Sequence, residues 1–282
     1  MRRGLAAVLL LGLAARAVGA QEPILLRANR AIGLVTRYRS DMDTWMRTPL
    51  LASADTSLPT VHVTMHSTRT VLSADSGVFL VGTLIDSSHF DMPAVTALAP
   101  QLAQSGDFLR GLRTETRSDT NGKGQATRVV AAPNMPNNLP TLIRGVQSLA
   151  LTGMRLTSFT LPDHPIGPGA TWSDTVSIEL ASSLNVAVEF VEGGGRSLGT
   201  FTLERFEQRD GRRIAIITSA GRISGSGGDA GASATLVVTA RARYDFDVAA
   251  GTIVHAQMDL EGPLSTRYGV IPTRMHLVMQ VL

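Results

Sequence analysis

Strict alternation of apolar and polar residues in the last third of the chain limits its fold more than any other feature. The pattern runs through residues 236–246, returns over 254–260 and is repeated over 275–281. A period of two places successive side chains on opposite faces of a β-strand. Because short turns join these segments, antiparallel pairing between sequence neighbours is the simplest arrangement. We therefore predict a mainly β (α+β) fold built on an antiparallel sheet.

A stretch rich in proline and glycine, LPDHPIGPGATW at 161–172, separates this regular part from the first half of the chain. Its prolines fix φ and remove backbone donors, and its glycines permit conformations that other residues avoid. We predict a rigid, extended crossover that ends by placing Trp172 in the core. Beyond it, Asp210-Gly211 is a strong hairpin signal, and the Gly/Ser-rich residues 221–233 are predicted to form a flexible loop.

The first half of the chain mixes strand and helix patterns. Strands are predicted over 24–38, 61–66 and 78–85, and a hairpin over 112–131 turns at Asp119-Thr-Asn-Gly122. Residues 78–85 are apolar on both faces, so we expect this strand to be covered on both sides.

Two segments in this half are typical of helices. Asn138 is a suitable N-cap, Pro140 fits the first helical turn, and an apolar stripe follows over 139–151. A weaker helix over 93–104 is interrupted by Pro100. Such helices can cover one face of a sheet.

Long strands with one apolar face bend as they twist. We therefore predict a strongly curved antiparallel sheet or open half-barrel with one or two packed helices. Residues 21–282 are expected to form this single domain. The alternative is an organisation in two halves, 21–160 and 161–282, because 113–130 and 241–258 share a strand–turn–strand pattern.

The first twenty residues have the features of a secretory signal peptide. Arg2 and Arg3 precede an apolar run over 5–15, and small residues stand before Gln21. The run is too short to span a bilayer. We expect a mature chain that begins at Gln21, is exported to the periplasm or the extracellular space, and has no transmembrane segment.

Charge and cysteine content exclude several classes of function. Three of the 26 lysines and arginines lie in residues 1–20, which leaves 23 basic against 23 acidic residues in the expected mature chain. Nucleic-acid binders need a net basic surface, so we expect no nucleic-acid partner. The sequence has no cysteine, which excludes disulfides, thiolate metal sites and thiol nucleophiles.

The histidines are the main candidates for chemistry. His62 and His66 share a strand face but lie about 13 Å apart by strand rise, too far to share one metal ion. His255 and His276 are predicted to face each other near Arg241 and to form either an anion-binding patch or a solvated sheet face.

Other reactive patterns are weak. His89-Phe-Asp91 and His164 have no accompanying nucleophile motif, and the turn at 119–122 lacks the acidic ligands of a calcium loop. We therefore predict no catalytic residue, no metal site and no cofactor, and the sequence defines no ligand-binding residue.

The crossover pattern Leu161-Pro-x-x-Pro-Ile-Gly-x-Gly-Ala-Thr-Trp172 resembles a signature in a family of uncharacterised secreted or lipid-anchored bacterial proteins. A turn with Asp and Gly between the late strands of that family is matched by Asp247-Val-Ala-Ala-Gly251. The resemblance implies the curved antiparallel half-barrel of periplasmic lipoprotein carriers, which hold acyl chains against an apolar concave face. This chain lacks the cysteine that follows the signal in lipid-anchored members.

These observations favour an exported envelope protein that is not an enzyme and binds a hydrophobic or amphipathic ligand such as a lipid. One alternative is an interaction or scaffold module that docks an envelope protein partner through the loop at 221–233. The other is a hydrolase with a non-standard site, which predicts a histidine within hydrogen-bond reach of a carboxylate in a cleft.

Overall fold

The computed structural model describes residues 22–28, 31–47, 55–98, 107, 109–131, 159–180, 193–227, 234–266 and 269–282. The expected signal peptide at 1–20 and the expected helix at 139–151 lie outside these residues. Among the described residues, no helix is long and apolar enough to cross a membrane.

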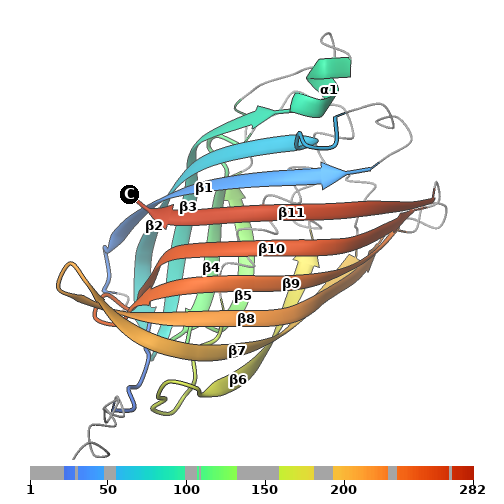
Figure 1. The fold of residues 1–282 in the computed structure, drawn as a ribbon. Coiled ribbons are helices and arrows are strands. Elements are labelled where there is room, and N and C mark those ends of the chain that lie inside the picture. The colour runs from blue at the N-terminus through green and yellow to red at the C-terminus, as the bar shows by residue number, and fades with distance from the viewer. Residues whose placement is uncertain are drawn as a thin grey trace, which may run out of the picture.

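The described residues form one antiparallel sheet of eleven strands (Figure 1). In chain order these are β1 (Val35–Met46), β2 (Val61–Asp75), β3 (Val78–Asp91), β4 (Arg113–Asp119), β5 (Gly124–Ala131), β6 (Thr171–Leu180), β7 (Gly193–Arg209), β8 (Arg212–Gly227), β9 (Ala234–Asp247), β10 (Thr252–Thr266) and β11 (Gly269–Val281). The mainly β, antiparallel fold predicted from the sequence is therefore confirmed.

The strand order is β5-β4-β3-β2-β1-β11-β10-β9-β8-β7-β6. Each half of the chain is a meander of sequence neighbours, and the two meanders join where β1 pairs with β11. Strands β5 and β6, which follow each other in the chain, lie at opposite edges, so the sheet does not close into a barrel. It is not strongly curled either, so the strongly curved sheet or open half-barrel expected from the sequence is wrong.

The predicted hairpins form where the sequence has turn residues. Asp210 and Gly211 have φ values of 51° and 73°, as a two-residue turn between β7 and β8 requires. Between β4 and β5, the Asp119 carboxylate accepts hydrogen bonds from the backbone N–H groups of Asn121 and Lys123, each at 2.9 Å. Gly122 completes this turn with a φ of 84°.

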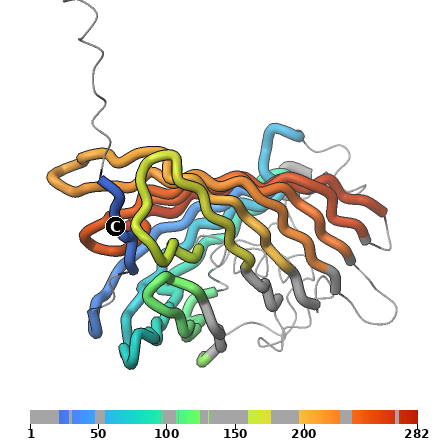
Figure 2. Tube along the Cα trace, turned by 90° about the horizontal axis from the view of Figure 1, so that it is seen from below, coloured from blue at the N-terminus to red at the C-terminus, as the bar shows by residue number. Residues whose placement is uncertain are grey.

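The crossover ties the two edges of the sheet together at one end (Figure 2). Leu161 N–H donates to the Asn121 carbonyl at 2.6 Å, in the β4–β5 turn, and Gly169 N–H donates to the Leu203 carbonyl of β7 at 2.7 Å. Ile166 forms an antiparallel bridge with Ile24 of the N-terminal segment. The extended crossover predicted from proline and glycine is thus confirmed.

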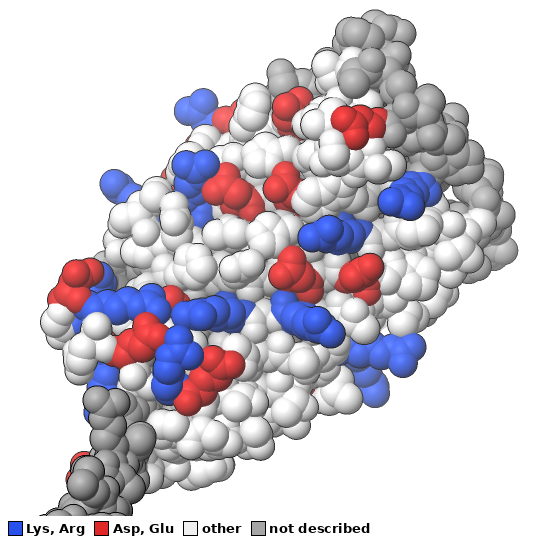
Figure 3. All heavy atoms as spheres, in the orientation of Figure 1, with Lys and Arg blue, Asp and Glu red and all other residues white. Residues whose placement is uncertain are grey.

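The two faces of the sheet differ in character. The face that carries Met42 of β1 and Leu277 of β11 is buried, and we call it the inner face. The outer face carries the alternate residues, including Asp43 and His276. Figure 3 shows acidic and basic side chains interspersed over this outer face.

Several sequence expectations need correction. The strand expected at 24–38 begins only at Val35, and before it Ile24 makes a single bridge. Strand β3 is not covered on both sides throughout, since Ile85 is 2% exposed whereas its neighbour Leu84 is 40% exposed. The first turns of the helix expected at 93–104 are present as α1 (Pro93–Leu98), whose Ala94 is buried, and residues 99–104 lie outside the described part.

The Gly/Ser-rich segment is also not a loop in its first half, because β8 continues to Gly227. A Cβ at Gly221 would collide with the backbone of Leu198 and Gly199 on β7. Glycine at position 221 therefore allows two strands to approach closely, and it does not make the segment flexible. Residues 228–233 lie outside the described part.

Candidate functional site

Methionine side chains line the centre of the inner face. Five of the ten methionines of the chain lie on four adjacent strands, and all are less than 5% exposed. They are Met65 on β2, Met42 on β1, Met275 and Met279 on β11, and Met258 on β10. The register places Met42 beside Leu277 and Leu277 beside Met258, so they form one continuous apolar strip. Methionine is flexible and polarisable, and it adapts to apolar surfaces of irregular shape.

One hydroxyl within this strip has no hydrogen-bond partner among the residues that the structure describes. Thr44 is fully buried on β1, between Val61 of β2 and Met275 of β11 in the register. Its Oγ1 makes no hydrogen bond to any residue that the structure describes. A buried polar group without a partner is costly, and native proteins usually avoid it. Thr44 therefore offers a hydrogen bond to a group that reaches the inner face.

An aromatic cluster covers the inner face at the crossover end. Phe159 lies with its ring centroid 4.7 Å from Tyr244, 5.0 Å from Phe201 and 6.3 Å from Trp172. Trp172 Nε1–H also donates to the Thr160 carbonyl at 2.8 Å, so this tryptophan packs against the core as predicted. Burial raises the pKa of Tyr244 to about 12, although a hydrogen bond with Ser219 opposes the shift.

The outer face carries a row of alternating acidic and basic residues across the joint between the two meanders. In strand order, the row is Asp91, His62, Asp43, His276, Asp259 and Arg241. His62 Nδ1 lies 2.7 Å from Asp43 Oδ1, and His276 Nδ1 lies 2.8 Å from Asp259 Oδ1. Cross-strand contacts of this kind stabilise a sheet, and these two link β1 to β2 and β10 to β11.

His62 also contacts a hydroxyl, which gives an acid–histidine–hydroxyl arrangement. Its Nε2 lies 3.2 Å from Thr64 Oγ1, and that hydroxyl donates to Asp41 Oδ1 at 2.8 Å. Because the hydroxyl proton is directed to Asp41, His62 Nε2 must donate rather than accept. In a nucleophilic triad the histidine nitrogen must instead accept the hydroxyl proton. The arrangement therefore does not place His62 as a general base toward Thr64.

The Asp41 carboxylate belongs to the same surface network. Burial by itself would raise its pKa, but hydrogen bonds from Arg39 and Thr64 and the charge of Arg39 hold the pKa below its usual value. Arg39 Nε donates to Asp41 Oδ2 at 2.9 Å. The carboxylate is thus kept ionised by its partners.

Three other histidines take no part in these networks, and His255 is not where the sequence predicts it. His255 and His276 do not face each other, because His255 pairs in register with Gln280, four residues beyond His276. His66 Nδ1 contacts Ser87 Oγ at 3.1 Å, and exposed His164 contacts Asp163 at 2.9 Å. Among the described residues, no group of three or more potential ligands could hold a metal ion.

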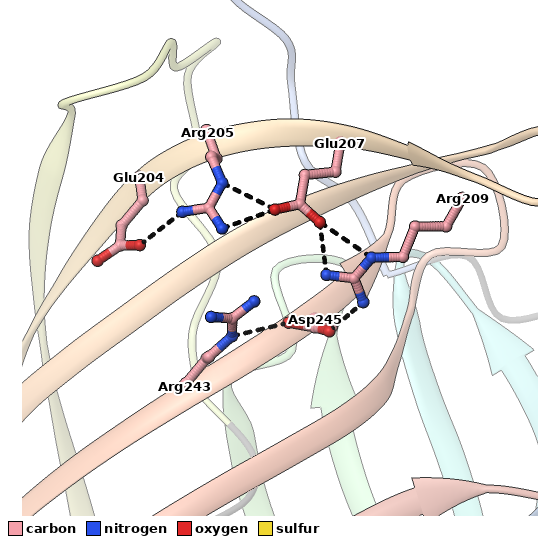
Figure 4. Close-up of polar contacts among 6 residues, drawn as sticks. All are labelled: Glu204, Arg205, Glu207, Arg209, Arg243 and Asp245. Carbon is pink, nitrogen blue, oxygen red and sulfur yellow. Dashed lines mark hydrogen bonds and ion pairs between the residues drawn. The ribbon is translucent and has the colours of Figure 1, made fainter.

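A second ionic network lies on the outer face of β7 and β9 (Figure 4). Glu207 accepts hydrogen bonds from Arg209 and Arg205, which hold its pKa below the usual value. Arg209 also pairs with buried Asp245, and Arg243 Nε donates to the same carboxylate at 3.3 Å. With Glu204 added, its three carboxylates and three guanidinium groups balance. The network stabilises the sheet and has no surplus charge for a ligand.

Sequence reasoning missed the methionine strip and Thr44. The signal is visible in the alternation of Met42 and Thr44 on β1 and of Met275 and Met279 on β11. What the pattern does not contain is the pairing of β1 with β11, which brings these residues together.

No protein-family model matches this chain, and no curated protein matches it.

Proposed function

We propose that this protein is an exported envelope protein that binds a hydrophobic or amphipathic ligand, such as an acyl chain, against the methionine-lined inner face. The observation that carries the proposal is the adjacency of five buried methionines to the unpartnered Thr44 hydroxyl. In this proposal the protein has no catalytic residue and needs no cofactor. In this proposal one face of the open sheet serves as the wall of the ligand site.

The chemistry of the inner face supports a flexible apolar ligand. Ligand sites are mostly apolar, with a few polar groups that fix orientation. The methionine side chains can repack around chains of different shape, since each has three rotatable bonds. Thr44 supplies the single polar contact, for a hydroxyl, ester or carboxyl oxygen of the ligand. This combination favours an amphipathic molecule over a pure hydrocarbon.

The outer face supports the assignment of ligand binding to the inner face. Its acidic and basic side chains pair with one another, as in the row at Asp43 and in the network around Asp245. Paired surface charges keep a sheet soluble and leave little free energy for ligand binding. Ligand binding is therefore assigned to the inner face.

The test is lipid extraction from protein purified from a bacterial envelope, followed by mass spectrometry. We expect co-purifying lipid in the wild-type protein and a clear reduction in the Thr44→Val variant. The matched control is Thr60→Val, because Thr60 is also buried but already bonds Met46 N–H at 2.9 Å. Wild-type protein free of lipid, or equal lipid in the two variants, would contradict the proposal.

A further inference from the structure

A row of polar side chains crosses the inner face of the sheet beyond the methionine strip. The register pairs Thr36 of β1 with Arg69 of β2. It then pairs Arg69 with Thr83 of β3, and Thr83 with Thr114 of β4. Thr36 lies on the inner face because it alternates in step with Met42 along β1. All members of the row are half-buried, and we call them together the arginine row.

The guanidinium group of Arg69 is held over an aromatic ring. Its Cζ lies 4.8 Å from the ring centroid of Tyr38, which is 3% exposed and belongs to the inner face. The Tyr38 hydroxyl contacts Thr252 Oγ1 at 3.1 Å, which fixes the ring. Stacking on a ring occupies the face of a guanidinium group and leaves the N–H donors at its edge available. Arg69 therefore presents hydrogen-bond donors from a defined position.

Arg69 makes no ion pair with any residue that the structure describes. Arginines of the outer face differ in this respect, since Arg39 pairs with Asp41 and Arg209 pairs with Asp245. A cation that is partly removed from water and has no counter-charge costs free energy. An anionic group bound at Arg69 would recover this cost.

The acidic residues of β1, β2, β3 and β4 do not share the inner face with Arg69. Asp86 accepts from Thr68 Oγ1 at 2.7 Å, and Thr68 points to the outer face because it precedes Arg69 in the same strand. Two others stand at strand ends beside turns, namely Asp75 and Asp119. The remaining four are on the outer face by register: Asp41, Asp43, Asp91 and Glu115.

The threonines of the row add neutral donors beside the charge. The hydroxyls of Thr36, Thr83 and Thr114 make no side-chain hydrogen bond to a residue that the structure describes. Side chains that face each other across neighbouring strands lie about 5 Å apart. Hydroxyl and guanidinium groups both donate to the oxygens of a carboxylate or a phosphate. The row therefore combines one cation with several donors on the face assigned to the ligand.

We propose that the arginine row binds the anionic group, a carboxylate or a phosphate, of an amphiphile whose chain lies along the methionine strip. This inference rests on the proposed function and names the class of its ligand. Thr36 and Thr44 are eight residues apart on β1, which is about 26 Å by strand rise. Met42 and Met65 line the path between them. An anionic group at Arg69 leaves Thr44 to a second oxygen farther along the same ligand.

A purely structural role for Arg69 makes a different prediction. If the side chain only covers the ring of Tyr38, its contribution is the same with every ligand. A guanidinium group that binds the ligand directly contributes more when the end group of the ligand is charged. Ligands with the same chain and different end groups therefore separate the two roles.

The experiment is equilibrium dialysis of the full chain, after removal of co-purified lipid, at neutral pH. The ligands are decanoate, decyl phosphate and decanol, each below its micelle concentration. The test variants are Arg69→Gln and Arg69→Lys. The matched control is Arg37→Gln, because Arg37 is an exposed arginine next to Thr36 on β1 but lies on the outer face.

We expect the wild-type protein to bind at least one of the two anions about tenfold or more tighter than decanol, because charged hydrogen bonds are the stronger ones. The tighter anion identifies the end group. Arg69→Gln should bind the anion and decanol within about twofold of each other and keep the wild-type affinity for decanol. Arg69→Lys should keep part of the preference, since an ammonium group retains the charge but not the paired donors. Arg37→Gln should match the wild type.

Different failures identify different errors. Equal wild-type affinity for decanol and both anions would overturn this inference and leave the proposed function standing. An equal loss of all ligands in Arg69→Gln, or loss of the preference in Arg37→Gln, would also overturn the inference. Failure to bind any of the ligands would overturn the proposed function as well. Circular dichroism verifies folding, and the Arg69→Lys result decides the matter if Arg69→Gln does not fold.

Discussion

Replacement of Thr44 by valine should stabilise the protein in the absence of ligand. The two side chains have nearly the same shape, and the change removes a buried hydroxyl that has no partner among the described residues. Leaving such a group unsatisfied costs about 1–3 kcal/mol. We therefore expect Thr44→Val to raise the free energy of unfolding by about 1 kcal/mol or more. The same variant should bind amphipathic ligand less well, because it loses the proposed polar contact.

The matched variant is Thr60→Val, which should have the opposite effect on stability. Thr60 Oγ1 accepts from Met46 N–H at 2.9 Å and donates to the Met46 carbonyl at 3.3 Å. Its loss leaves two backbone groups without these bonds, so the free energy of unfolding should fall by about 1–3 kcal/mol. Urea unfolding followed by tryptophan fluorescence measures both variants. If Thr44→Val is destabilised as much as Thr60→Val, the Thr44 hydroxyl has a structural partner and the argument from it fails.

Two further predictions concern the aromatic cluster. Phe159→Ala should lower the free energy of unfolding by about 3–5 kcal/mol in the same urea assay, because the ring is buried and packs against three other aromatic rings; a loss below about 1 kcal/mol would show that the crossover is not anchored there. Burial raises the pKa of Tyr244 to about 12, whereas the unfolded chain ionises near 10. The contribution of the buried neutral phenol to the free energy of unfolding is therefore fully present below pH 10. About 2–3 kcal/mol of it is lost as the pH rises to 12. Unfolding curves of Tyr244→Phe should lack this decrease, and equal alkaline loss in both proteins would refute it.

The hairpins could be predicted from the sequence because their signals are local. Asp210-Gly211 determines a turn by itself, and the Asp119 carboxylate organises its own turn through neighbouring N–H groups. The pairing of β1 with β11 could not be predicted, because it joins residues such as Met42 and Leu277 that lie far apart in the chain. The candidate site depends on that pairing, so its residues were visible in the sequence but their adjacency was not.

Register explains the other differences between sequence and structure. The position of His255 relative to His276 depends on the register between β10 and β11, which pairs His255 with Gln280 and His276 with Asp259. A shift of one residue would move every side chain of a strand to the opposite face. The alternation itself gives the face of each histidine but not its partner across the strand.

Alternation along the strands gives a physical reason why the proposed ligand site and the charged side chains of the outer face do not interfere with each other. The methionine strip lies on the inner face of the central strands, and Arg37 lies on the outer face of β1. Alternation along β1 places Met42 and Arg37 on opposite sides of the same backbone. Substitutions of charged residues on the outer face should therefore leave the proposed ligand site on the inner face intact. The strongest support for this division would be a difference between two variants: Thr44→Val should reduce bound lipid, and Arg37→Gln should leave it unchanged.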